Sequence, residues 1–522
     1  MIIRNLGVAV LLAGCMVAGG AGALPAGAAP PADLAADLDG RPARSLDGDL
    51  AEDLDAILKD GRLRGAAVGV VVRDAESGEV LFDRDGDGQV MPASNNKLPT
   101  SAAAFGILGA GYRFRTTVSA KGGNLYLKGT GDTTMRAADY DRLAAAVAGK
   151  GVTEVEGDLV ADDTWFDADR VPGGWDLADL QYAYAGQTSA LTVSPNADFD
   201  AGSIDVTVAA TRPGRPVRAR LRPATGVVKI DNRAATGRAG SPSTLAVKRR
   251  NGSNTMVITG SHPAGAPAAS VLRAVERPTL YAADVFRRAL KAHGVRVAGA
   301  TERGRTPAGA KTIATRTSMP LSRLAKPFMK LSNNVMAETL VKAIGRKARG
   351  EGSWAAGLPA VTAYAERLGV DAEQVTMTDG SGLARSNRTT ARQLSILLRH
   401  ARKQAWFPAW YASLPVAGRS DRLVGGTLAK RMRGTAAAGN VHAKTGTLTG
   451  VTALSGYVRS PDGRTLIFSS VFNGYSGGAP KDVEDRIAVR LAAGDGAGGG
   501  AAPRSGTPVD GGGLESTWRR SR

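Results

Sequence analysis

The chain has 522 residues, a length at which one hydrophobic core usually gives way to two or more, and 43% of the residues are hydrophobic. The 67 Lys and Arg outweigh the 48 Asp and Glu, so the formal net charge is +19. This balance suits polyanionic surroundings, which could be nucleic acid, anionic lipid or anionic wall polymers. Nucleic acid is not expected as a partner, because no basic segment is interleaved with aromatic residues and no recognition-helix or zinc-finger spacing occurs.

Residues 1–29 have the layout of a secretory signal peptide. Arg4 precedes an apolar run over 6–12, and small residues continue to Ala29. Two Ala-Gly-Ala triplets, at 21–23 and 26–28, are candidate cleavage sites. We therefore expect a secreted, extracytoplasmic protein that is associated with the cell wall.

The single cysteine, Cys15, leaves an alternative localisation open. The segment Leu12-Ala13-Gly14-Cys15 resembles a bacterial lipoprotein signal, in which the cysteine would carry the lipid. The next residues, Met16-Val17-Ala18, continue the apolar run, which favours soluble export over an anchor at Cys15. In either case the mature chain would hold no disulfide.

Residues 48–114 are predicted to form the first part of a catalytic domain, after a flexible lead-in over 30–47 that is rich in Ala, Asp and Pro. Helical spacing of apolar residues begins at Leu50 and ends near Gly61. Two strand patterns follow, at 66–73 and 79–82.

The turn at 83–88 matches the start of a calcium loop, but Ser94 stands at the twelfth position, where such a loop needs a glutamate. A polar turn is therefore favoured. Ser94 and Lys97 form a Ser-x-x-Lys pattern at the start of a helix, which places both side chains on one face, one turn apart. Pro99 should kink this helix just beyond Lys97 or confine its regular part.

From 115 to 275 the helical periodicity gives way to short alternating runs, which predicts an inserted, mostly β region. Within it, 244–250 and 255–259 flank Asn-Gly-Ser-Asn, a hairpin signal, and only 140–148 reads as a helix. Because this region lies between two halves of one catalytic domain, we expect it not to contribute to the chemistry.

Residues 276–492 are predicted to form the second part of the catalytic domain. A helix is expected after Thr279 as its N-cap, and strands over 452–458 and 465–472 close the domain. Further helices are expected at 321–331, 334–344, 392–400 and 480–491. Residues 493–522 read as a disordered, Gly-rich basic tail.

Two later motifs complete the Ser-x-x-Lys pattern. Ser332-Asn333-Asn334 lies between two predicted helices, and Lys444-Thr445-Gly446-Thr447 precedes the closing strands. Ser-x-x-Lys, Ser-x-Asn and Lys-Thr-Gly in this order are the motif set of serine β-lactamases and penicillin-binding proteins.

With these motifs the chain resembles the D-alanyl-D-alanine carboxypeptidase/endopeptidase family, the class C low-molecular-mass penicillin-binding proteins. Lys97 and Ser332 are 235 positions apart (332 − 97), a gap that the family fills with inserted domains. The stretches 125–132, 179–182, 189–191, 379–385 and 426–428 also fit the family. Ser-Asn-Asn departs from the commoner Ser-Asp-Asn, a change that should be tolerated because the middle residue need not face the substrate.

The resemblance implies an α/β (α+β) fold, in which a β-lactamase/transpeptidase-like domain with an antiparallel sheet flanked by helices carries the insertion. It also implies a serine-type D-Ala-D-Ala carboxypeptidase, with DD-endopeptidase action left open, that trims peptidoglycan stem peptides and is inhibited covalently by β-lactams. No metal or organic cofactor is expected.

The catalytic residues that follow are Ser94, Lys97, Ser332 and Asn334. Ser94 would attack the peptide carbonyl, and Lys97 would accept its proton as a neutral amine. Ser332 and Asn334 would relay the proton to the leaving amine and hold the acyl side chain. The substrate-binding residues are Lys444, Thr445, Gly446 and Thr447, and the resemblance implies an oxyanion hole from the backbone N–H groups of Ser94 and Thr447.

Two other functions remain open at this point. A β-lactamase would need a dedicated base for the deacylating water, and a wall-binding protein could keep the fold without turnover. His442 shares a strand face with Lys444 and is a weak candidate for substrate contact, whereas Trp406 and Trp410 are interpreted as core or groove wall.

Overall fold

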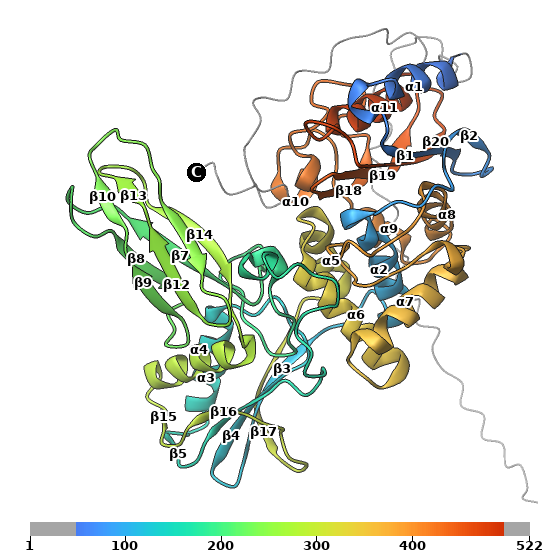
Figure 1. Cartoon of the computed structure of the whole chain (residues 1–522). Helices are drawn as coiled ribbons and strands as arrows, with labels where there is room; N and C mark the ends of the chain where they lie inside the picture. The colour runs from blue at the N-terminus through green and yellow to red at the C-terminus, as the bar shows by residue number, and fades with distance from the viewer. Residues whose placement is uncertain (1–48, 495–522) are drawn as a thin grey trace, which may run out of the picture. The chain divides into compact units, whose positions relative to one another are not determined.

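The computed structural model describes residues 49–494, which lie within a single compact unit of the chain. A five-stranded antiparallel sheet with the order β18-β19-β20-β1-β2 lies between the two cores of the expected catalytic domain and is called the central sheet (Figure 1). Its strands are β1 (Ala67–Asp74), β2 (Val80–Arg84), β18 (His442–Leu448), β19 (Val451–Arg459) and β20 (Thr465–Asn473). The sheet therefore joins the two ends of the described chain, as expected for a catalytic domain built from two separated segments.

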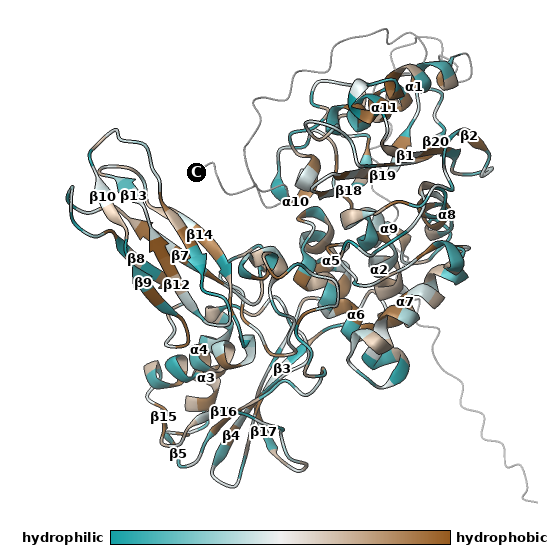
Figure 2. Ribbon diagram, in the orientation of Figure 1, coloured by the Kyte–Doolittle hydropathy of each residue, from teal (hydrophilic) through white to brown (hydrophobic). Residues whose placement is uncertain are grey.

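Strand β20 shows how this sheet separates two cores. Phe468 and Phe472 face α1 (Leu50–Leu58) and α11 (Lys481–Ala493), whereas Ile467 and Val471 face the helices on the other side. Alternate residues of a strand point to opposite faces, so a strand covered on both faces is largely apolar. Figure 2 shows hydrophobic residues along much of β19 and β20, whereas β18 carries the polar Lys-Thr-Gly-Thr motif.

The second face carries the helical layer. Its members are α2 (Lys97–Ala103), α5 (Leu321–Lys330), α6 (Asn334–Arg349), α7 (Trp354–Arg367), α8 (Ala391–Ala401), α9 (Phe407–Tyr411) and α10 (Arg422–Gly425). The expected β-lactamase/transpeptidase-like arrangement, an antiparallel sheet flanked by helices, is confirmed. No helix within 49–494 is long and apolar enough to cross a bilayer.

Helix α7 was not predicted, because Gly357 and Pro359 interrupt its sequence pattern. The glycine has a packing role: a Cβ at position 357 would lie 2.2 Å from the carbonyl oxygen of Val341 on α6. The small residue that weakens the helical signal therefore permits the close contact between α6 and α7.

The inserted part contains a second five-stranded sheet, in the order β16-β6-β4-β3-β17. Its strands are β3 (Arg115–Lys121), β4 (Asn124–Gly129), β6 (Leu159–Asp162), β16 (Thr301–Arg303) and β17 (Lys311–Thr317). Helices α3 (Ala137–Ala148) and α4 (Pro278–Ala292) pack on one another and against this sheet. Strands β5 (Glu154–Val155) and β15 (Arg296–Val297) form a separate short parallel pair.

The boundary expected at residue 275 therefore falls inside the insertion. Helix α4 and strands β15–β17 share the hydrophobic core of β3, β4 and α3, so the insertion runs from Arg115 to Thr317. Phe114 and Ser318 mark its two ends, where each backbone N–H is bonded to the other residue at 2.9 Å. The apolar periodicity of α4 shows which face of the helix is buried, but it does not show which hydrophobic core that face packs against.

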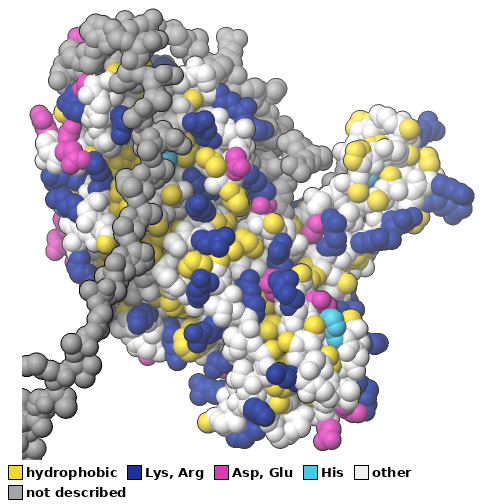
Figure 3. Space-filling model, turned by 180° about the vertical axis from the view of Figure 1, so that it is seen from behind, with side chains coloured by type: hydrophobic (Ala, Val, Ile, Leu, Met, Phe, Trp, Pro, Cys, Tyr) yellow, Lys and Arg dark blue, Asp and Glu magenta, His cyan; other side chains and the backbone are white. Residues whose placement is uncertain are grey.

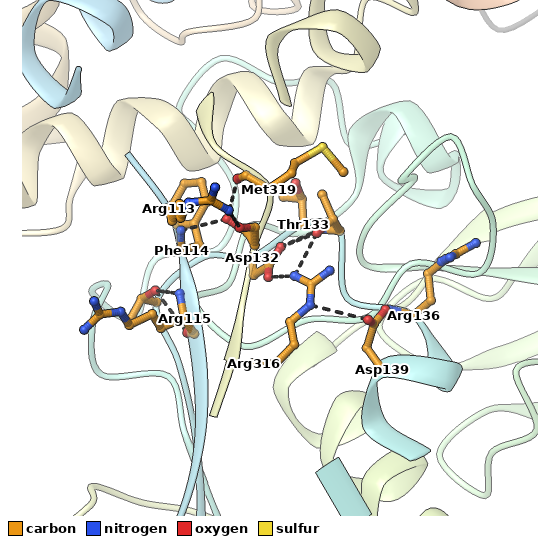
Figure 4. A network of polar contacts seen from close by, with 12 residues as sticks. Arg113, Phe114, Arg115, Asp132, Thr133, Arg136, Asp139, Arg316 and Met319 are labelled. Atoms are coloured by element: carbon orange, nitrogen blue, oxygen red, sulfur yellow. Dashed lines mark hydrogen bonds and ion pairs between the residues drawn. The ribbon is translucent and has the colours of Figure 1, made fainter. Parts of the chain in front are cut away.

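An ion-pair network ties the insertion together near these ends. The Arg316 side chain on β17 points toward Asp132 and Asp139 (Figure 4) and forms ion pairs with both, at 3.4 Å to Asp139. Asp132 follows β4 and Asp139 lies in the first turn of α3, so one guanidinium links three segments.

Residues 203–274, which we call the strand lobe, form the remaining sheets of the insertion. Strands β7 (Ser203–Ala209), β8 (Arg218–Arg222) and β14 (Ala269–Ala274) pair in the order β14-β7-β8. Strands β9 (Lys229–Asn232), β11 (Ala246–Arg249) and β12 (Thr255–Thr259) pair in the order β11-β12-β9, and β10 (Ala235–Gly237) pairs with β13 (Ser261–Pro263). The hairpin predicted around residues 251–254 is confirmed as the antiparallel β11–β12 pair.

Pro99 is the third residue of α2, whose regular part is confined to Lys97–Ala103 between a 3-10 turn and a π-helical turn, in line with one of the two expectations for this proline. One local prediction is wrong. Thr279 is not the N-cap of α4: the cap is Arg277 with a φ of 59°, and the Thr279 hydroxyl donates to Asp163 instead. The predicted signal peptide, the lead-in over 30–47 and the tail beyond 494 lie outside the described residues.

Candidate active site

Ser94 and Lys97 lie where the sequence pattern predicts, one turn apart. Ser94 belongs to a 3-10 turn, Ala93–Asn96, that continues directly into α2, and Lys97 is the first residue of that helix. The Lys97 Nζ atom lies 2.9 Å from the Ser94 Oγ atom. Lys97 is fully buried, whereas Ser94 is only partly buried, so the hydroxyl is accessible and the amine is shielded.

The turn that carries Ser94 is held between two glycines. A Cβ at Gly382 would lie 1.8 Å from the carbonyl oxygen of Ala93, and one at Gly446 would lie 2.8 Å from that of Pro92. Ala93 itself has a φ of 46°, a backbone conformation that costs a non-glycine residue about 1–3 kcal/mol. Close packing on both sides maintains this strained turn and fixes the position of Ser94.

Three oxygen atoms surround the Lys97 amine. Besides Ser94 Oγ, the side-chain oxygen of Asn334 lies 2.6 Å and the backbone oxygen of Ser381 2.7 Å from Nζ. The Asn334 amide nitrogen donates to the carbonyl of Tyr184 at 3.0 Å, which orients its oxygen toward Lys97. Because Tyr184 belongs to the insertion, the insertion supplies a backbone contact that orients a site residue, and its expected lack of a chemical role stays a prediction.

Ser332 and Lys444 form a second polar pair. The fully buried Lys444 amine donates to Ser332 Oγ at 2.8 Å and to the Thr445 carbonyl at 2.7 Å. Ser332 has a φ of 56°, so this motif also rests on a strained turn. Between Ser332 and Asn334, the Asn333 side chain caps α6 by accepting from the Met336 N–H at 3.0 Å, which explains why asparagine suits this middle position.

The Lys-Thr-Gly-Thr motif lies on β18, an edge strand of the central sheet. Thr445 donates to the Thr427 hydroxyl at 2.8 Å, whereas the buried Thr447 hydroxyl has no protein partner in the described part of the chain. An edge strand offers backbone donors and acceptors to an extended peptide. This strand can therefore bind a peptide backbone beside Ser94.

A buried carboxylate that the sequence did not predict lies behind Ser381. Glu338 accepts from the backbone N–H of Ser381 at 2.8 Å, from that of Gly380 at 3.1 Å and from the Trp354 indole at 2.8 Å. Burial and the neighbouring Asp379 raise the pKa of Glu338 to about 7. Glu338 follows Asn334 by four residues on α6, a spacing that could have marked it as a neighbour of the site.

Asp379 holds the same loop from its other side. Its carboxylate accepts from the N–H groups of Gly382 and Ala384, both at 2.7 Å, and from the Trp175 indole at 2.8 Å. Together Asp379 and Glu338 fix the segment 379–384, in which the Ser381 carbonyl accepts a hydrogen bond from the Lys97 amine. The conformation of this loop therefore controls one of the three oxygens around the amine.

The remaining candidates have structural roles. His442 stacks on Tyr411 with ring centroids 4.3 Å apart, and burial lowers the pKa of His442 to about 4. Trp410 is buried and donates to Ser101 at 2.8 Å, and Trp406 packs against the same core, in line with the core interpretation. Within residues 49–494, no three His, Cys, Asp or Glu side chains are grouped so that they could hold a metal ion.

Comparisons of sequence and of structure with known proteins point to the same family. Residues 50–494 match the D-Ala-D-Ala carboxypeptidase 3 (S13) family. A D-alanyl-D-alanine carboxypeptidase of Actinomadura sp. (strain R39) is 50% identical over 484 residues, which cover 90% of each chain. The crystal structure of penicillin-binding protein 4 (dacB) from Haemophilus influenzae superposes with a TM-score of 0.72 at 23% identity, covering 84% of this chain and 98% of that one. The same protein complexed with a novel β-lactam gives a TM-score of 0.67, with 23% identity and the same coverage.

Proposed function

The chain belongs to the D-Ala-D-Ala carboxypeptidase 3 (S13) family, and we propose that it performs this reaction through an acyl-enzyme formed on Ser94. It is a D-Ala-D-Ala carboxypeptidase, a hydrolase that acts on peptidoglycan peptides. The observation that carries the proposed site is the Lys97 amine, 2.9 Å from the Ser94 hydroxyl and bonded to two carbonyl oxygens.

Lys97 acts as the base in this proposal. A neutral amine has two N–H donors and one lone pair. The oxygens of Asn334 and Ser381 accept hydrogen bonds from the two N–H groups of the Lys97 amine. The nitrogen lone pair is then directed at the Ser94 hydroxyl. Ser94 Oγ attacks the carbonyl carbon between the two terminal D-alanines while its proton moves to Lys97.

Ser332 acts on the leaving group. When the C–N bond breaks, the departing D-alanine amine needs a proton, and the Ser332 hydroxyl, held by Lys444 at 2.8 Å, can pass one from Lys97. Asn334 holds the acyl side chain with its amide. Water then hydrolyses the ester and restores Ser94.

Strand β18 binds the substrate carboxylate and the developing oxyanion. Lys444 contributes positive charge, and the hydroxyls of Thr445 and Thr447 are donors on the same strand. The unpaired Thr447 hydroxyl is the donor most available to a carboxylate oxygen. The backbone N–H groups of Ser94 and Thr447 form the oxyanion hole, where losing one donor costs about 3 kcal/mol of transition-state stabilisation.

β-Lactams are proposed to acylate the same serine, because their strained amide occupies the position of the scissile peptide. The β-lactam complex of the Haemophilus influenzae protein supports binding of such compounds by this fold. Cleavage of D-alanyl cross-bridges would use the same acyl-enzyme with a larger amine as leaving group. The signal pattern over 1–29 and the net charge of +19 support action outside the cytoplasm, in contact with anionic wall polymers.

The test is release of D-alanine from an N-acylated peptide that ends in D-Ala-D-Ala, with a peptide ending in L-Ala-L-Ala as control. The proposal expects stereospecific release by the wild type, none by Ser94→Ala, and slow release by Ser332→Ala. A purified D,D-cross-linked dimer assayed in parallel measures endopeptidase action. Retained release by a folded Ser94→Ala variant would refute the proposed nucleophile.

A further inference from the structure

The strand lobe carries more than half of the formal net charge of the chain. Residues 203–274 contain 12 Lys and Arg but only 2 Asp, a net charge of +10 out of +19. On the face shown in Figure 3, Lys and Arg side chains gather over this lobe, at the upper right, and acidic side chains are scarce there. None of the catalytic motifs lies in it, so the charge has no role in the reaction described above.

Strand β8 arranges part of this charge in a row. Arg218, Arg220 and Arg222 are exposed and alternate with Ala219 and Leu221, which pack toward the core. Alternate residues of a strand lie roughly 6.6 Å apart on one face. Because β8 is an edge strand of its sheet, the row is open along one side.

The lobe does not neutralise this row. Asp205 pairs with Arg222 at 3.0 Å, and Asp231 pairs with Arg233 and Arg250. Arg218 and Arg220 form no ion pair within the described residues, and Arg212 and Arg215 add two more exposed cations just before the strand. Uncompensated like charges destabilise a fold through repulsion, which a bound polyanion relieves.

The other side chains of the lobe indicate the kind of polyanion. Residues 203–274 contain no Phe, Trp or Tyr, so the lobe has no platform on which nucleobases could stack. Of the large hydrophobic side chains exposed in the described chain, which are Val80, Leu177, Leu423 and Val424, none belongs to the lobe, so it has no anchor for a bilayer. What remains is a linear row of charge, suited to a linear chain of phosphates.

We propose that the arginine row of β8, with Arg212 and Arg215, binds a linear phosphodiester polymer of the cell wall. The proposal rests on the extracytoplasmic function proposed above. Binding would hold the enzyme beside its peptidoglycan substrate without occupying the Ser94 site. Arg218 and Arg220 are the central contacts, because neither is committed to a carboxylate.

The experiment measures binding of purified poly(glycerol phosphate) to the full chain at several salt concentrations. Arg218→Gln/Arg220→Gln is compared with Lys347→Gln/Arg349→Gln, which removes the same charge from exposed positions near the end of α6. We expect the β8 variant to bind at least tenfold more weakly. For single-stranded nucleic acid, each phosphate contact contributes about 0.7 to the magnitude of the slope of log K against log salt concentration. Loss of two such contacts should therefore reduce the magnitude of this slope by about 1.4.

Equal affinity and slope for the two double variants would overturn the proposal. So would binding of the wild type to phosphatidylglycerol vesicles without binding to the polymer, which would assign the row to a membrane. D-Alanine release from a soluble peptide is measured on the same samples and should not change in either variant. Absence of D-alanine release by the wild type would instead refute the proposed function.

Discussion

Replacing Gly446 by alanine should slow acylation of Ser94 about tenfold to a hundredfold while the protein stays folded. Gly446 lies on β18 against the turn that carries the nucleophile. Its backbone needs no glycine conformation, because its φ lies outside the left-handed region. The added methyl group therefore acts through contact alone.

The size of the effect follows from the distances around that methyl group. It would lie 2.8 Å from the Pro92 carbonyl oxygen, 3.1 Å from the Ala93 Cβ and 3.2 Å from the Ala453 Cβ. Ordinary contacts of this kind begin near 3.4 Å, so the turn and β18 must separate by about half an ångström. A displacement of about 1 Å at a reacting group costs roughly a hundredfold in rate, and overpacking costs about 1–3 kcal/mol of stability.

The assay is the second-order rate of labelling by a fluorescent penicillin, with urea unfolding measured on the same protein. Gly111→Ala is the matched control, because a Cβ at Gly111 meets nothing within 4 Å. The control should label at the wild-type rate. A wild-type labelling rate for Gly446→Ala would show that the contact between β18 and the Ser94 turn does not position the nucleophile.

Three further predictions concern the site residues Lys444 and Asn334 and the buried His442, which has a structural role. Lys444→Arg should retain part of the wild-type kcat/KM for a D-Ala-D-Ala peptide, and Lys444→Gln should lose most of it. The reason is that Lys444 is proposed to act through its positive charge beside Ser332. Equal losses in the two variants would show that Lys444 acts through its shape instead. Asn334→Asp would place a carboxylate where the amide oxygen now lies 2.6 Å from the Lys97 amine, which would raise the pKa of Lys97. Because the base must be neutral, the acid limb of the pH–rate profile should move to higher pH. An acid limb that does not move would contradict the role of Lys97 as the base. The pKa of His442 falls from 6.5 to about 4 on folding, so the unfolding free energy should decrease by up to about 3 kcal/mol as pH drops from 6.5 to 4, because the unfolded chain takes the proton first. His442→Phe, which keeps a ring beside Tyr411, should flatten that dependence and leave peptide hydrolysis at pH 8 within about threefold of wild type; a pH dependence unchanged by the substitution would rule out His442 as its source.

The side-chain motifs of the site could be predicted from sequence because each has a fixed spacing or residue order. Ser94 and Lys97 are one turn apart on a helix, and Ser332, Asn334 and Lys444 contact one another or Lys97 as their motifs imply. The backbone groups that complete the site could not be predicted. The carbonyls of Tyr184 and Ser381 are present in every residue, so only the fold places them beside Asn334 and Lys97.

The fold shows the same division. Strands β19 and β20 and helices α5, α6, α8 and α11 follow from apolar periodicity, which is a local property. The end of the insertion is not local: α4 would show the same apolar stripe whether it packed on α3 or on the central sheet. Helix α7 was missed for a related reason, since Gly357 reflects a contact with Val341 that the sequence does not show.

Peptide mapping by mass spectrometry after incubation with benzylpenicillin tests most directly whether Ser94 is the nucleophile. The site described here predicts one penicilloyl group per molecule, located on Ser94, and no adduct in a folded Ser94→Ala variant. An adduct on Ser332, or on any other residue of the wild type, would contradict the assignment of Ser94 and Lys97 as nucleophile and base.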